Sequence, residues 1–410
     1  MNYFPTAFKG ASWFSVLRIV IRGLTIIKIA VLARLLLPAQ FGEFGIATIL
    51  LGLLEIFTET GINVFLLQEK SDPEKYIDTA WGISIIRGTI ISLFILLSAP
   101  LVSQFFRVTH IIPLIYLISL VPLIRGFINP MIVKFQKDLK YRQEFAYRSI
   151  IILVESAVII ALAMLTRSVY SFAWGLIASA LLEVLISHLF VHPRPKLKFN
   201  VSQAKQIITR GKWVTGFGIM EYVYTQSDNV VVGRFLGQSP LGIYQNAYKL
   251  SVLPLTEIGE VFYKVTFPIF VRLTHYPDRL KKAAIKSSLI LVSLLFVSSF
   301  ALFYLAQPII SIFLGPNWQA AVPLIKILAF LGFLRGLGYS FNSLFLALKK
   351  QHRVTVITTT SAAGLLFSII PLVTTYGLSG AAYSAMFGAA LALVPATYFV
   401  WISMRELSRA

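Results

Sequence analysis

Long, uninterrupted runs of apolar residues alternate along the chain with short polar segments. The runs lie at 11–37, 42–68, 77–104, 111–133, 145–166, 169–191, 211–236, 241–270, 283–306, 319–346, 354–375 and 379–403. Each is about 20 residues or longer, the length that a helix needs to cross the hydrocarbon core of a bilayer. Only helices and closed barrels satisfy their backbone there, and barrel strands are short and alternating. The pattern therefore predicts an all-α integral membrane protein with about 12 transmembrane helices.

The composition agrees with a lipid environment. Of the 410 residues 57% are hydrophobic and 13% are charged, whereas about a quarter of a soluble chain is charged. The net charge of +20 raises the question of nucleic acid, but the basic residues lie in short loops between apolar runs, so we expect no nucleic-acid partner. With no cysteine and five scattered histidines, we expect no disulfide, no metal site and no cofactor.

Basic residues in the loops predict the orientation of the chain. With the N-terminus inside, the inner loops carry clusters such as Lys134–Arg142, Arg194–Lys205 and Arg279–Lys282, while the outer loops hold only Arg107 and Arg167. Positive charge accumulates on the cytoplasmic side of membrane proteins. Both termini are therefore expected in the cytoplasm and the chain in the plasma (inner) membrane. The run after residues 1–9 is too long for a cleavable signal, so it is assigned as the first span.

The chain also repeats itself. Residues 33–36 and 41–44 match residues 233–236 and 241–244 at an offset of 200, and residues 123–127 match 333–337 at an offset of 210. Because each half holds an even number of spans, the repeats keep the same orientation. We expect two pseudo-symmetric six-helix lobes, 1–191 and 210–410, joined by a cytoplasmic basic connector at 192–209. Transporters built from such parallel repeats place their site between the halves.

Charged residues within the first and third spans are candidates for a cationic site. Arg18 and Arg22 are four residues apart and share a helix face, and Lys28 lies deeper in the same span. Two guanidinium groups on one face suit bidentate contacts to a diphosphate. Arg87, in the third span, is a further cavity candidate. The alternative for Arg18 is that it extends to the cytoplasmic interface.

Polar residues within the second and seventh spans are candidates for substrate binding or ion coupling: Glu55, Glu59, Glu221, Tyr224, Asp228 and Asn229. The offset of 200 makes Asp228 the counterpart of Lys28, so we expect the two to face each other between the halves. The alternative interpretations are a polar seam between helices for the seventh span and static ion pairs within one lobe for the glutamates. Arg125 and Arg335, which mark the repeat, are expected to share a structural role. No catalytic residue is predicted.

The sequence resembles the Wzx-type polysaccharide transporters, in particular the colanic-acid exporters. These belong to the multidrug/oligosaccharidyl-lipid/polysaccharide exporter superfamily. The resemblance lies in the segment 33–44, in its counterpart 228–244, and in Asn246–Lys249 and Phe267–Pro268, which follow. The resemblance implies lobes around a central cavity that opens alternately to either side, and a polyprenyl-diphosphate-linked oligosaccharide as cargo. It also implies a cationic lumen, for which Arg18, Arg22 and Lys28 are residues of the matching type. Several relatives carry two further C-terminal spans, so no role of those helices is transferred.

The predicted function is therefore that of a flippase for lipid-linked oligosaccharides, with membrane lipids, a polysaccharide polymerase and glycosyltransferases as expected partners. No phosphate-binding glycine-rich motif is present, so transport is expected to draw on a proton or sodium gradient or the membrane potential. The first alternative is an ion-coupled multidrug or small-cation exporter of the same superfamily, against which the basic first span argues. A membrane-embedded glycan polymerase is a second alternative, against which the short outer loops argue.

Overall fold

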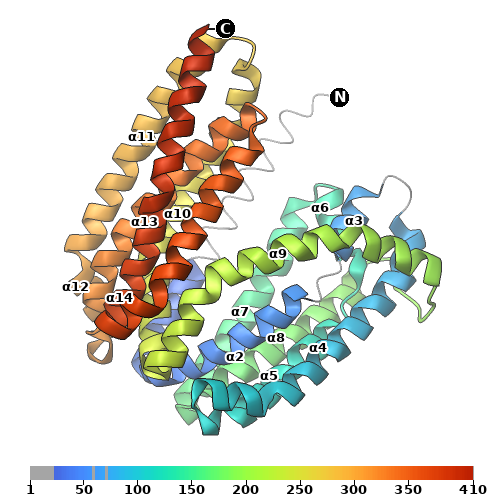
Figure 1. Ribbon diagram of the computed structural model, residues 1–410. Helices are drawn as coiled ribbons and strands as arrows, with labels where there is room; N and C mark the ends of the chain where they lie inside the picture. Colours follow the sequence, from blue (N-terminus) through green and yellow to red (C-terminus); the bar gives the residue numbers. More distant parts are fainter. Residues whose placement is uncertain (1–22, 58–60, 70–72, 410) are drawn as a thin grey trace. The chain divides into compact units, whose positions relative to one another are not determined.

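A computed structural model describes residues 23–57, 61–69 and 73–409. The secondary structure of these residues is helical, with no strand among them. The chain divides into two compact units inside the long helix α9 (Val201–Leu236), the first ending at Gln226 and the second beginning at Ser227 (Figure 1). The expected lobe and connector boundaries remain a prediction, and each unit is described by itself.

The first unit is a helical bundle. It contains a helical segment at 23–35, α2 (Pro38–Phe57), α3 (Ile62–Gln68), α4 (Ile77–Phe106), α5 (Ile112–Arg125), α6 (Lys134–Lys137), α7 (Tyr141–Thr166), α8 (Tyr170–Phe190) and the first part of α9. Helix α5 packs against α4 and α8, α7 packs against α8, and α2 packs against α4 and α5. The described residues of each predicted span of this half lie largely in helices.

Two glycines bring α4 and α5 into backbone contact. A Cβ atom on Gly88 would lie 2.4 Å from the carbonyl oxygen of Pro122, and one on Gly126 would lie 3.0 Å from the carbonyl oxygen of Ser84. A larger residue at Gly88 would clash with the backbone of α5, and one at Gly126 would require the neighbouring backbone to shift by a few tenths of an ångström. Since an arginine precedes each glycine, the close approach also sets Arg87 and Arg125 at the same level of the bundle.

Two predicted spans, 42–68 and 111–133, each fall on more than one helix. The span expected at 111–133 is bent by 75° between Arg125 and Pro130, because a residue that precedes proline is disfavoured in a helix. The buried Asn129 satisfies the turn by accepting from the Met131 backbone N–H and donating to the Val191 carbonyl. Helix α9 begins at Val201, within the segment assigned as the connector, and its residues Ala204 and Ile207 pack into the apolar core of the first unit.

The second unit repeats these helix pairings. It contains the end of α9, α10 (Gln238–Leu273), α11 (Pro277–Tyr304), α12 (Ala306–Ile309), α13 (Ala321–Ala347) and α14 (Gln351–Arg409). Helix α10 packs against α11 and α13, and α13 packs against α11 and α14 (Figure 1). The repeat aligns α2 with α10, α4 with α11 and α5 with α13, so corresponding helices contact each other in both units.

Helix α14 consists of two helices that meet at Gly377, whose backbone (φ 58, ψ −134) is not helical. This break separates the two predicted spans 354–375 and 379–403. The two halves then approach closely, because a Cβ atom on Gly364 would lie 2.9 Å from the Cα atom of Gly388.

Seven helices of the described residues are long and apolar enough to cross a membrane, or up to eight if the bent pair at α5 and α6 is one span. Helices α9 and α10 are not among them because both carry polar stretches, and α14 counts once although it breaks at Gly377. The chain is therefore a multi-pass helical membrane protein, while the count of 12 stays a prediction.

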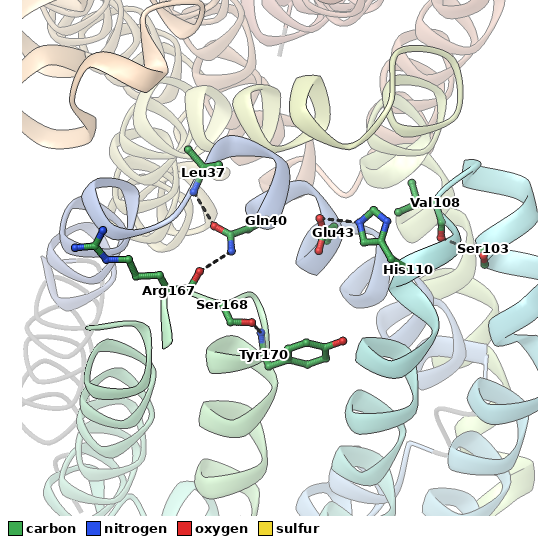
Figure 2. Close-up of polar contacts among 9 residues, drawn as sticks. All are labelled: Leu37, Gln40, Glu43, Ser103, Val108, His110, Arg167, Ser168 and Tyr170. Atoms are coloured by element: carbon green, nitrogen blue, oxygen red, sulfur yellow. Dashed lines mark hydrogen bonds and ion pairs between the residues drawn. The ribbon is translucent and has the colours of Figure 1, made fainter. Parts of the chain in front are cut away.

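Side-chain hydrogen bonds join the helix ends at one end of the first unit (Figure 2). Gln40 accepts from the Leu37 backbone N–H at 2.8 Å and donates to the Arg167 carbonyl at 2.8 Å, which ties the start of α2 to the turn between α7 and α8. The buried Glu43 of α2 contacts His110, which lies in the segment between α4 and α5, with 3.1 Å between Oε1 and Nε2. The predicted outer loops at 105–110 and 167–168 thus lie at the same end of this unit.

Candidate functional site

The residues predicted for the cationic site are only partly described. Arg18, Arg22 and Glu59 lie outside the described residues. Lys28 forms an ion pair with Glu155 of α7, with 2.6 Å between Nζ and Oε1 and 18% of each side chain exposed. A charge this far inside a bundle needs such a partner, because an unpaired ammonium group would lose its hydration without compensation.

A cavity of about 400 Å³ lies within the first unit, between α2, α4, α5, α7 and α8. Its lining includes two predicted residues, Glu55 and Arg87, together with Arg125, for which the sequence suggested a structural role. Arg87 donates to the backbone carbonyl of Glu55 at 3.4 Å. The paired glycines of α4 and α5 place the two arginines at the wall of this cavity.

Arg125 lies between two carboxylates from different helices. Its Nη1 is 3.6 Å from Glu55 Oε1 of α2, and its Nε is 3.5 Å from Glu183 Oε2 of α8. The hydroxyl group of Tyr147 in α7 donates to the same Glu183 at 3.2 Å. One guanidinium group thus connects three helices of the bundle.

A second charged cluster completes the cavity wall. The buried Glu144 accepts from Arg148 at 3.0 Å and from Gln136 at 2.7 Å. Where the structure describes the lining, it contains as many arginines as glutamates. A polar cavity of this volume holds several water molecules, and its arginines suit the recognition of carboxylates or phosphates.

The polar stretch of α9 is divided between the two units. In the first unit Tyr222 donates to the Ile49 carbonyl of α2 at 2.5 Å, and its ring would contact a Cβ atom on Gly52. Glu221 is exposed and Tyr224 is partly buried. The sequence prediction named the neighbours of Tyr222 but did not assign it to the site.

In the second unit Asp228 is buried, with 3% of the residue exposed. It accepts from the Tyr244 hydroxyl group of α10 at 2.9 Å, and the backbone N–H of the partly buried Asn229 donates to it at 2.8 Å. Lys28 and Asp228 thus each have a partner within their own unit. That they face each other stays a prediction.

The repeat-marking arginines connect corresponding helices. In the second unit Arg335 of α13 donates to the hydroxyl group of Tyr248 in α10, and its Cζ lies 5.7 Å from the centre of that ring. In the first unit Arg125 of α5 lies beside Glu55 of α2. The arginines occupy equivalent helices but have different partners, because position 48, the counterpart of Tyr248, is a threonine.

Sequence reasoning missed two features of the first unit. Arg125 was grouped with Arg335 because both halves keep it, although the Arg-Gly pairs at 87–88 and 125–126 signal a close helix crossing flanked by charge. Outside the cavity, the contact between Glu43 and His110 was also missed, since its partners lie on separate helical segments (Figure 2).

Comparison with known sequences places this geometry in context. A family model described as "Polysaccharide biosynthesis protein" matches residues 31–323. The lipopolysaccharide biosynthesis protein WzxC of Escherichia coli K12 is 23% identical over 349 residues, covering 83% of this chain and 69% of that protein. The succinoglycan biosynthesis transport protein ExoT of Rhizobium meliloti is 24% identical over 340 residues, covering 77% and 66%.

Solved structures share the fold. The lipid II flippase MurJ in an inward closed conformation matches with a TM-score of 0.76 at 15% identity, over 96% of this chain and 89% of that chain. An inward-facing multidrug resistance transporter of the MATE family, in the MOP superfamily, matches with a TM-score of 0.70 at 14% identity, over 96% and 99%. At these identities the likeness concerns the fold alone.

Proposed function

The chain belongs to the polysaccharide biosynthesis protein family, and on this premise we propose that it is a flippase. Its cargo is a polyprenyl-diphosphate-linked oligosaccharide, which it moves from the cytoplasmic to the outer leaflet by alternating access. The observation that carries the proposal is the family match over residues 31–323. The likeness to WzxC and ExoT, whose names place them in polysaccharide biosynthesis, supports it.

The physical task explains why such a protein needs polar groups inside its helical bundle. An unpaired hydroxyl group in hydrocarbon costs about 4–8 kcal/mol, so several sugars and a charged diphosphate face a barrier of tens of kcal/mol. Each 1.36 kcal/mol is a factor of about ten in rate, and spontaneous flipping is therefore negligible. A hydrated, charged chamber for the headgroup removes most of that barrier.

The proposal includes the finer architecture expected from the sequence. It has twelve spans in two lobes around a central cavity, both termini in the cytoplasm and the chain in the inner membrane. Arg18, Arg22, Lys28 and Arg87 bind the headgroup, and Asp228 and its polar neighbours take part in substrate binding or ion coupling. A proton or sodium gradient or the membrane potential drives the cycle. Glycosyltransferases supply the cargo, a polymerase consumes it, and no catalytic residue is assigned to this chain.

Reconstituted transport tests the proposal. Purified protein is placed in liposomes that carry a fluorescently labelled polyprenyl-diphosphate oligosaccharide, and a membrane-impermeant quencher reports the leaflet of the label. We expect protein-dependent exchange between leaflets that is absent from empty liposomes. Liposomes with protein that flip no faster than empty ones, with and without an imposed gradient, would contradict the proposal.

The same liposomes distinguish the flippase function from the second candidate, a small-cation exporter. That candidate is suggested by the likeness of the fold to the MATE transporter. A flippase moves the labelled lipid and leaves a fluorescent organic cation where it was added. An exporter does the reverse.

A further inference from the structure

Arg125 lies farther from its carboxylate partners than a charge-assisted hydrogen bond allows. Its contacts to Glu55 and Glu183, at 3.6 and 3.5 Å, exceed the 2.7–2.9 Å of charge-assisted hydrogen bonds. Within the described chain its Nε is buried and has no hydrogen-bond partner. A guanidinium group with five donors, held at this distance beside a cavity of about 400 Å³, is placed to receive a better acceptor.

Two other basic side chains of the same unit lie closer to their carboxylate partners. Lys28 is 2.6 Å from Glu155, and Arg148 is 3.0 Å from Glu144. The repeat counterpart Arg335 donates to Tyr248. Arg125 has two carboxylates beside it where Arg335 has a hydroxyl group, so the chemistry around the equivalent arginine differs between the two halves.

The charged and titratable groups that line this cavity come from each surrounding helix: Glu55 of α2, Arg87 of α4, Arg125 of α5, Glu144, Tyr147 and Arg148 of α7, and Glu183 of α8. Among the described lining residues, three arginines and three glutamates balance when all are ionised. An anion therefore adds uncompensated negative charge unless a glutamate takes up a proton. Protonation of Glu55 or Glu183 also frees the donors of Arg125.

We propose that this cavity of the first unit binds a phosphate-bearing anion through Arg125, together with a proton taken up by Glu55 or Glu183. The inference rests on the proposed function, in which the anion is the diphosphate diester of the lipid carrier. Bidentate contacts between the planar guanidinium group and phosphate oxygens replace the two long carboxylate contacts. Anion binding is then tighter at low pH, because the proton neutralises the competing carboxylate.

Binding of dimethyl diphosphate to the full-length protein in lipid nanodiscs tests the site. This soluble diester keeps its charge near neutral pH, so any pH dependence belongs to the protein. We expect saturable binding that tightens as the pH falls from about 8 to about 6, and that Arg125→Gln weakens about tenfold or more. The control Arg279→Gln, an exposed arginine of the second unit, retains wild-type affinity.

A second variant protects the test against misfolding. Glu183→Gln removes the competing charge, so we expect it to bind dimethyl diphosphate about fivefold more tightly than the wild type near pH 8, with a flatter pH dependence. A gain in affinity cannot arise from loss of folded protein. Unchanged affinity in both Arg125→Gln and Glu183→Gln would overturn the inference.

Dimethyl phosphate separates the two sources of this chemistry. Weaker binding of this monophosphate diester supports the carrier diphosphate as the ligand, and equal binding assigns the site to a phospholipid headgroup and overturns that part of the inference. The flipping assay is read separately. If the wild type flips the labelled lipid, and Arg125→Gln has the same flipping rate and the same affinity as the wild type, the cavity inference fails while the proposed flippase function stands. If the wild type does not flip, the proposed function fails.

Discussion

The ion pair of Lys28 and Glu155 shows how a single charge is accommodated inside the first unit. The two side chains meet at 2.6 Å with 18% of each exposed. Removing one partner leaves the other buried and uncompensated, whereas replacing both with apolar residues of similar size removes the burial penalty together with the attraction. The pair therefore makes a clear prediction for stability.

We expect Lys28→Met to lower the free energy of unfolding by about 1–3 kcal/mol, and the double variant Lys28→Met/Glu155→Leu to regain most of this loss. Thermal unfolding of the four proteins of this cycle in detergent measures both effects. A double variant as unstable as the sum of its single changes would show that the residues are not coupled. Comparing flipping in the stable double variant with the wild type then tests the role of Lys28 in transport.

At the residue scale, the sequence identifies candidate charges better than it identifies their partners. Glu55 and Arg87 are recognisable because a charge in an apolar run needs a reason, and both line the cavity. The roles of Arg125 and Glu183 are not predictable in this way. Their contacts join α2, α5 and α8, and depend on how closely these helices cross. The pattern along one helix does not contain that distance.

At the scale of a single element, α14 depends on glycine for the sharp turn between its two halves. Gly377 has φ 58, and a Cβ atom on Gly380 would lie 1.9 Å from the Leu372 carbonyl oxygen. We expect Gly380→Ala to force the two halves apart and to reduce the yield of monodisperse protein several-fold. Fluorescence-detected size-exclusion chromatography measures this yield.

The matched control is Gly338→Ala in α13, where nothing lies within 4 Å of the added Cβ atom. Alanine favours a helix by about 1 kcal/mol over glycine, so this variant should be at least as well expressed as the wild type. Equal yields of the Gly380 and Gly338 variants would contradict the predicted clash.

Apolar periodicity and length predict the helices well, but they do not predict every break. The two halves of α14 were expected as separate spans because residues 376–378 interrupt the apolar sequence. The bend after Arg125 was not expected, because residues 126–133 remain mostly apolar and the turn depends on Asn129 bonding to the Val191 carbonyl. The early start of α9 was not predicted because this part of the sequence contains basic residues. Lys205 lies on the exposed side of the helix, while Ala204 and Ile207 pack into the apolar core of the first unit.

At the scale of the whole molecule, the repeat in sequence corresponds to a repeat in helix pairing, with α2, α4 and α5 matched by α10, α11 and α13. What differs between the units is their chemistry. The first unit carries the ionic cavity around Arg125, whereas the second contains a buried carboxylate bonded to a tyrosine. The two units have thus kept the same helix pairings while their polar residues differ.

The orientation of the molecule gives the last prediction. Since the sequence contains no cysteine, a single introduced thiol is labelled without background. Arg167 and Lys198 are both exposed, and the distribution of basic residues places Arg167 outside and Lys198 in the cytoplasm. A membrane-impermeant maleimide should therefore label Arg167→Cys in intact spheroplasts and Lys198→Cys only after lysis. Because the two positions lie at opposite ends of α8 and its flanking turns, labelling of both from the same side would require a different number of crossings, and with it a different path for the headgroup.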